Sequence, residues 1–236
     1  MPVRPVSPYR RIVVGTDGSD SAIRAVRHAG WLAGALGADL IVTHAYPQAR
    51  EDLASPQRVG ASVLRDACAR IPGASPTSML RTGEAAGTLV GLAREEEADL
   101  IVVGNRGLGS RRVLMGTVPG RVAQRAPCDV LIAHTTEEEP EAPYRRVILA
   151  TDRSPTADRA VAAGRSLADA VGAESEEIHV TEGDPAAGIL RAAAERSADL
   201  VVVGNVGLTG ARRFLVSVPS RVARRSPCHV LLVKTS

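Results

Sequence analysis

The feature that most constrains this chain is an internal repeat. Residues 99–133 match residues 199–233 at 19 of 35 positions, a similarity that chance does not produce. Both segments run from an apolar stretch through a glycine-rich turn into a basic stretch: VVGNRGLGSRRVLMGTVPGRV in the first copy and VVVGNVGLTGARRFLVSVPSRV in the second. A repeat of this kind predicts that the chain holds two copies of one structural unit.

The two copies are unequal in length. RRIVVGTDGSDSA at 10–22 resembles RRVILATDRSPTA at 145–157, but the displacement there is 135 residues rather than 100. The displacement falls from 135 to 100 between residues 172 and 183, so the second copy lacks 35 residues that the first contains. We expect this deletion to remove the second strand and the helix after it, so that 177–181 forms the strand before a helix over 185–196.

Short apolar runs alternate with helical segments along the first copy. Several of these segments start near Ser, Asp or Pro, as helix N-termini do. Alternation with short connections predicts parallel strands and right-handed crossovers. The fold class is therefore α/β: two tandem, doubly wound, Rossmann-like parallel-sheet domains, the second truncated by one strand and one helix. The expected strands are 12–16, 40–45, 78–81, 100–103 and 130–133, and the expected helices are 20–36, 56–70, 84–96 and 117–125.

An acidic, proline-bearing segment, TTEEEPEAPY at 135–144, separates the copies and has the composition of a solvated linker. We expect a first domain at 1–136, a linker at 137–144 and a shortened, degenerate second domain at 145–236. We call residues 1–136 the first repeat and residues 145–236 the second repeat.

Composition excludes several classes of protein. Aromatic residues make up 2% of the 236, which argues against stacking platforms for nucleic acid. The net charge is +3, and Lys234 is the one lysine among 29 basic residues, so we expect no nucleic-acid partner. Three cysteines without CxxC spacing fit neither a disulfide framework nor a zinc site, which favours the cytoplasm. We expect no signal peptide and no membrane span.

The glycine-rich turn follows the most apolar expected strand. In open α/β sheets, ligands bind beyond the carboxyl ends of the strands. Glycine at Gly104 and Gly107 lets the backbone turn and lets a phosphate approach without meeting a Cβ atom. The helix near Thr117 presents free amides and its positive dipole end to an anion. The chain has neither a P-loop nor a GxGxxG after its first strand, so neither common nucleotide motif applies.

The combination of motifs resembles the universal stress proteins in their tandem-domain form. The matching pieces are VVGTDGS (13–19), GNRG (104–107), GT (116–117) and VPGRVAQRAPCDVLIA (118–133), and the resemblance covers nearly all of both repeats. It implies a cytoplasmic α/β domain that binds ATP or AMP and that dimerises through its last strand. The binding residues that the resemblance implies are Gly15, Thr16, Asp17, Ala45, Val103, Gly104, Gly107, Gly116, Thr117 and Val118.

Each part of this set has an implied role. Gly15, Thr16 and Asp17 border the ribose and the adenine, and the backbone of Ala45 contacts the base. The glycine-rich loop and the start of the helix at 117 surround the ribose and phosphates. The Asp17 carboxylate can accept ribose hydrogen bonds, help hold Mg²⁺ through water, or form an Asx turn within TDGSDS. Eight residues rather than nine separate Gly107 from Gly116, one fewer than in the family pattern.

The second repeat departs further from the pattern. Asp152 remains, but Arg153 follows it where the first repeat has a glycine, and Val216 replaces Gly116. A valine Cβ where the backbone should approach a phosphate is a steric obstacle. We also expect the deletion to remove the base-contacting position, so the second repeat is predicted to bind nucleotide weakly or not at all.

The last strands of the two repeats have similar sequences, DVLIA at 129–133 and HVLLV at 229–233. Apolar sheet edges need cover, and two such edges in one chain can pair antiparallel. We expect an intrachain pseudo-dimer through these strands, and a further homodimer remains open.

Three functions are consistent with these residues. The first is adenine-nucleotide binding by a stress or signalling protein, with ATP, AMP or cyclic AMP as ligand and with or without Mg²⁺. The second is an enzyme related to ATP pyrophosphatases, but Asp17 stands where that loop needs glycine and no catalytic pair or paired carboxylates stand out. The third is a scaffold that binds no nucleotide. We expect no catalytic residue, no metabolic turnover beyond slow ATP hydrolysis or autophosphorylation, and no protein metal site.

Overall fold

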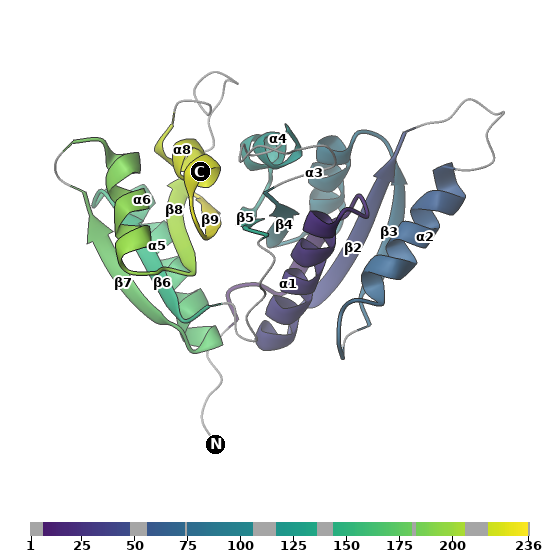
Figure 1. The fold of residues 1–236 in the computed structure, drawn as a ribbon, viewed down its shortest axis with the longest axis horizontal. Coiled ribbons are helices and arrows are strands. Elements are labelled where there is room, and N and C mark those ends of the chain that lie inside the picture. The colour runs from purple at the N-terminus through teal and green to yellow at the C-terminus, as the bar shows by residue number, and fades with distance from the viewer. Residues whose placement is uncertain are drawn as a thin grey trace.

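The computed structural model describes residues 7–47, 56–73, 75–105, 117–135, 144–180, 183–205 and 217–235. Its strands form one sheet in the order β3-β2-β1-β4-β5-β9-β8-β6-β7, with the first repeat on one side and the second on the other (Figure 1). The strands are Arg11–Gly15 (β1), Asp39–Tyr46 (β2), Thr77–Thr82 (β3), Leu100–Gly104 (β4), Asp129–Ala133 (β5), Arg146–Thr151 (β6), Glu174–His179 (β7), Leu200–Asn205 (β8) and His229–Lys234 (β9).

Helices cover both faces of this sheet, as the alternating pattern predicts. One apolar core lies under α1, α2 and α5, and a second lies under α3, α4, α6 and α8. Each core continues through both repeats, so the doubly wound α/β class is confirmed. The helices are Asp20–Leu36 (α1), Pro56–Cys68 (α2), Ala85–Glu95 (α3), Thr117–Arg125 (α4), Pro155–Val171 (α5), Pro185–Glu195 (α6) and Val218–Arg225 (α8).

The seam between the repeats is a pair of strands. β5 pairs with β9 antiparallel, with Leu131 opposite Leu231, whereas the other strand pairs of the sheet are parallel. Both of these leucines are completely buried. The apolar edges predicted to need cover therefore cover one another.

The deletion in the second repeat lies elsewhere than expected. β7 pairs with β6 in parallel, as β2 pairs with β1, and therefore corresponds to the second strand. The ring nitrogen Nδ1 of His179 lies 2.9 Å from the carbonyl oxygen of Thr151, as that of His44 lies 2.8 Å from the carbonyl oxygen of Thr16. The missing elements are thus counterparts of α2 and β3, and the expectation that the second strand is lost was wrong.

The acidic sequence of β7 explains why it was hard to recognise. In the first repeat Val42 of β2 is completely buried in the core that includes Leu64 and Ala67 of α2. The second repeat has no counterpart of α2, and Glu177 stands at the position of Val42, exposed and paired with Arg165. An edge strand without a covering helix needs charged side chains to stay soluble.

The segment between the repeats is not solvated at its ends. Thr135 and Tyr144 are 5% and 2% exposed, and residues 136–143 lie outside the described part of the chain. Tyr144 is buried because its ring packs against His28, Trp31 and His229, which the acidic composition of the segment conceals. Within the described residues, the model has no helix that could cross a membrane.

Tyr144 belongs to an aromatic cluster at the seam, in which it is buried and His28, Trp31 and His229 are half-buried. Its hydroxyl oxygen lies 2.7 Å from Nε2 of His28, and the ring of His28 stacks on His229 with 4.2 Å between centroids. Trp31 packs edge-on to Tyr144. Burial lowers the pKa of His28 to about 4, and burial with the neighbouring His28 and His134 lowers that of His229.

Acid should therefore loosen the seam. Between pH 6.5 and about 4 the unfolded chain binds a proton at His28 that the folded chain excludes. The free energy of unfolding therefore decreases as the pH is lowered through this range. At about 1.4 kcal/mol per pKa unit, His28 alone contributes up to about 3 kcal/mol of this loss. Denaturant unfolding at several pH values should show a smaller loss in His28→Gln than in the parent chain. The control is the same change at the exposed His179, His179→Gln. An equal dependence of the free energy of unfolding on pH in all three proteins would contradict the role given to His28.

Candidate functional site

In each repeat the candidate site lies where the order in which successive strands join the sheet reverses. β1 pairs with β2 on one side and with β4 on the other, and β6 likewise lies between β7 and β8. β1 is followed by α1 on one face of the sheet, and its neighbour β4 is followed by α4 on the other face. The carboxyl ends at this switch point are therefore left uncovered, which is where ligands bind in open α/β sheets.

The second repeat has a pocket of about 340 Å³ at this place. Its floor comes from the ends of β6, β7 and β8, and its walls come from the starts of α5, α6 and α8. It is lined by Ala150, Thr151, Asp152, Ser154, Thr156, Ala157, Ile178, Val180, Pro185, Ile189, Val203, Gly204, Asn205, Ser217, Val218 and Pro219.

The pocket lining contains the second-repeat counterparts of eight of the ten predicted residues. With displacements of 135 and 100, the counterparts of Gly15, Thr16, Asp17, Ala45, Val103, Gly104, Thr117 and Val118 are Ala150, Thr151, Asp152, Val180, Val203, Gly204, Ser217 and Val218. The base-contacting position that we expected to be lost is therefore present as Val180. This expectation was wrong because the deletion begins after β7 rather than before it.

In the first repeat the same strand ends carry the predicted residues. Gly15 ends β1, and Thr16 and Asp17 follow it. Ala45 lies near the end of the neighbouring β2. The remaining described members are Val103 and Gly104 at the end of β4 and Thr117 and Val118 at the start of α4. Gly107 and Gly116 lie outside the described residues.

Thr16 and Asp17 shape the turn into α1. The amide of Gly18, which has φ of 80°, donates to the Thr16 hydroxyl oxygen at 3.1 Å. The amide and hydroxyl of Ser19 donate to Oδ1 of Asp17 at 3.0 and 2.6 Å. The Asx turn considered as an alternative role for Asp17 is thus present, and the half-buried carboxylate stands at the rim of the strand ends.

Two glycines allow helices to lie close to the strand ends. A Cβ atom on Gly15 would lie 2.8 Å from a methyl carbon of Leu89 in α3. A Cβ atom on Gly104 would lie 3.2 Å from both the carbonyl and the hydroxyl oxygen of Ser21 in α1, where Gly204 leaves at least 3.5 Å. Close packing is therefore one reason for glycine at both positions.

Polar residues behind Gly104 were not predicted. The Thr135 hydroxyl donates to Oδ1 of Asn105 at 2.8 Å and lies 2.7 Å from the Ser21 hydroxyl. This network joins β4, the end of β5 and α1 directly behind the candidate site. The sequence held a signal for Asn105, because Asn105 and Asn205 both follow the glycine that the two repeats share. Asn205 makes a different contact, in which it donates to the Ala123 carbonyl of α4 at 3.0 Å.

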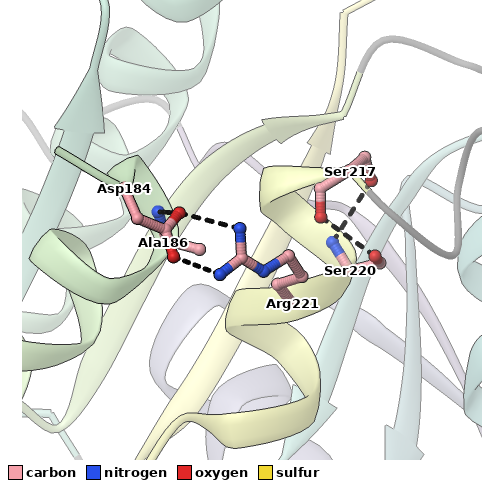
Figure 2. Close-up of polar contacts among 5 residues, drawn as sticks. All are labelled: Asp184, Ala186, Ser217, Ser220 and Arg221. Atoms are coloured by element: carbon pink, nitrogen blue, oxygen red, sulfur yellow. Dashed lines mark hydrogen bonds and ion pairs between the residues drawn. The ribbon is translucent and has the colours of Figure 1, made fainter.

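An acid–arginine pair beside each site was also missed. In the first repeat Arg121 of α4 donates to Oε1 of Glu84 at 3.0 Å, and Glu84 caps α3. In the second repeat Arg221 of α8 contacts both carboxylate oxygens of Asp184, which caps α6 (Figure 2). The spacing of 37 residues is the same in both repeats, which is the sequence signal.

The cysteines lie away from the candidate sites and are poor nucleophiles. Burial raises the pKa of the Cys128 thiol to about 12 and that of Cys228 to about 11. Such thiols are protonated at neutral pH and behave as small apolar groups. Within the described part of the chain, no group of three or more His, Cys, Asp or Glu side chains is arranged to hold a metal ion.

Comparison with known proteins places the chain in a family. The sequence model of the universal stress protein family matches residues 8–134 and 164–234. A universal stress protein of Mycobacterium tuberculosis is 40% identical over 152 residues, covering 56% of this chain and 100% of the relative. One from Thermus aquaticus is 34% identical over 134 residues, covering 52% of this chain and 98% of its own length.

Solved structures agree on the fold. The crystal structure of a universal stress protein from Archaeoglobus fulgidus covers 99% of this chain and 99% of its own, with a TM-score of 0.81 at 19% identity. A universal stress protein solved in complex with cAMP is 40% identical, covers 55% of this chain and all of its own, and has a TM-score of 0.49. Two segments match the family model, and single relatives match about half of the chain. The chain therefore belongs to the universal stress protein family and carries two copies of its domain.

Proposed function

We propose that the first repeat binds an adenine nucleotide, ATP or AMP, at the carboxyl ends of β1, β2 and β4. One observation carries the proposal. Of the ten residues that family resemblance assigns to the nucleotide, eight have counterparts that line one pocket at the switch point of the second repeat. The first repeat keeps the glycines and Asp17 that the resemblance requires, with the one-residue shorter loop as its departure.

Each group in the first repeat has a proposed task. Ala45 and the end of β1 border the adenine, and the Asp17 carboxylate accepts hydrogen bonds from the ribose. Gly104 and Gly107 allow the backbone to approach the ligand, and Gly116 and Thr117 offer amides at the start of α4 to the phosphates. Val103 and Val118 complete the apolar wall. Asp17 is the carboxylate suited to hold Mg²⁺ through water, with the phosphates supplying the other oxygen ligands.

The binding serves stress response or signalling in the cytoplasm rather than metabolic catalysis. The antiparallel pairing of β5 with β9 supports an intrachain pseudo-dimer, in which the second repeat takes the place of a second subunit. The outer strands β3 and β7 leave room for a further homodimer.

Calorimetry with the full chain tests the proposal. Titration with ATP, AMP and cyclic AMP, each with and without Mg²⁺, should show one site per chain for ATP or AMP. Asp17→Asn should weaken that site about tenfold, because a hydrogen bond to a charged acceptor contributes about 1.5–3 kcal/mol. The asparagine can still accept the hydrogen bonds of the Asx turn, so the change acts on the charge.

The matched control is Asp39→Asn. Asp39 starts β2 at the opposite end of the sheet, its side chain is 78% exposed, and its loss should leave affinity unchanged. Absence of heat with every nucleotide would favour the scaffold, and multiple-turnover release of AMP and pyrophosphate would favour the enzyme.

The second repeat supplies a natural substitution that tests the phosphate end. Gly116→Val introduces the side chain that stands at Val216. We expect ATP affinity to fall at least tenfold, since a Cβ atom with two methyl groups obstructs the approach of a phosphate to the backbone. Adenosine affinity in the first repeat should change less than threefold. Equal losses for ATP and adenosine, measured by calorimetry, would contradict a phosphate role for this glycine.

A further inference from the structure

The pocket of the second repeat has a more apolar lining than its counterpart positions in the first. Ile178 stands where the first repeat has Thr43, whose hydroxyl donates to the Met79 carbonyl of β3 at 2.9 Å. The deletion removes the counterpart of β3, and with it the partner of that hydroxyl. Ile178 and Ile189 are 8% and 5% exposed and form part of an aliphatic wall suited to a flat ring.

The charge of this lining is negative. Among the described residues that line the pocket, Asp152 is the one ionisable side chain. Hydrogen bonds from Ser154 lower the pKa of Asp152, so the carboxylate is ionised at neutral pH. An ionised carboxylate accepts hydrogen bonds from the hydroxyl groups of a sugar.

Arg221, in the helix whose start lines the pocket, is already paired with a carboxylate. Figure 2 shows Arg221 directed at Asp184, with its two terminal nitrogens on the two carboxylate oxygens. Asp184 also accepts from the amide of Ala186 at 3.2 Å, which fixes the carboxylate at the start of α6. In the corresponding pair of the first repeat, Arg121 contacts Oε1 of Glu84 at 3.0 Å. The positive charge of Arg221 is therefore balanced by the protein itself.

The start of α8 has few amides left for an anion. Ser217 caps the helix by accepting from the Ser220 amide at 3.4 Å, and the Ser220 hydroxyl donates to the Ser217 carbonyl at 3.0 Å (Figure 2). The Arg221 amide donates to the Ser217 carbonyl, and Pro219 has no amide hydrogen. The Ser220 and Arg221 amides are thus satisfied within α8 itself, whereas anion sites at helix N-termini use several free amides.

We infer that the pocket of the second repeat binds an uncharged nucleoside, with adenosine as the representative, in preference to a nucleotide. The ring lies against the aliphatic wall, and the sugar hydroxyls donate to Asp152. A volume of about 340 Å³ lies at the small end of the range of small-molecule sites, roughly 300–1,000 Å³. The choice of a purine nucleoside rests on the adenine-nucleotide function proposed for the first repeat. The preference for an uncharged ligand rests on the contact of Arg221 with both carboxylate oxygens of Asp184.

Methyl NMR of the full chain distinguishes this site from the first one. Ile178 and Ile189 line the pocket, and their counterparts Thr43 and Leu89 are not isoleucines, so isoleucine methyl labels report on the second repeat. Titration with adenosine should shift both signals, with a dissociation constant at least tenfold below that of AMP. AMP binding as tightly as adenosine at these two methyls, or no shift with adenosine up to its solubility, would overturn the inference.

A charge variant tests the cause of the preference. Asp184→Asn keeps a side chain that caps helices well but releases Arg221 from its ionic partner. AMP affinity at Ile178 and Ile189 should rise about tenfold, while adenosine affinity stays within twofold. Glu84→Gln, the matched change in the first repeat, should leave both constants unchanged.

An unaltered AMP affinity in Asp184→Asn would contradict the role of the ion pair. If instead the function proposed for the first repeat fails, calorimetry shows no heat of nucleotide binding. The response of the Ile178 and Ile189 methyl signals to adenosine is then unchanged.

Discussion

The parallel pairing of β1 with both β2 and β4 is the constraint on which the rest of the structure depends. The crossovers on its two sides run to opposite faces of the sheet, so no connection can close the gap beyond the strand ends. Glycines at Gly15 and Gly104 then let α3 and α1 pack against those ends, which sets the width of the opening. The second repeat reproduces this arrangement around β6, and there the opening is a pocket of about 340 Å³.

The 35-residue deletion changed the second repeat without removing this pocket. It falls between Val180 and Gly183, beyond the last pocket residue of β7 and before the start of α6. The deletion removed the counterparts of the outer strand β3 and of α2, the helix that covers β2. The exposed Glu177 at the position of the buried Val42 reflects the loss of that helix. The electrostatic difference is local: Arg221 contacts both carboxylate oxygens of Asp184, whereas Arg121 contacts Glu84 through Oε1. The two repeats are therefore expected to prefer ligands of different charge.

The sequence predicted the α/β class, the helix boundaries of α1 and α4, and the strand ends that carry the site, because apolar periodicity and glycine turns are local signals. It failed where the reason lies in a partner distant in the sequence. β7 was assigned to the wrong strand because its exposed side chains hide the relation to β2. Tyr144 was placed in solvent because its partner His28 is 116 residues away. Asn105 and the pair Arg121–Glu84 were missed because their contacts cross between elements.

The central claim is that the carboxyl ends of β1, β2 and β4 hold an adenine nucleotide. A crystal structure of the full chain grown with AMP tests it most directly. The account predicts difference density for a purine between Ala45 and Val103, with its ribose at Asp17 and its phosphate toward the start of α4. If side chains from residues 106–116 fill that space and AMP is absent at saturating concentration, the account is contradicted.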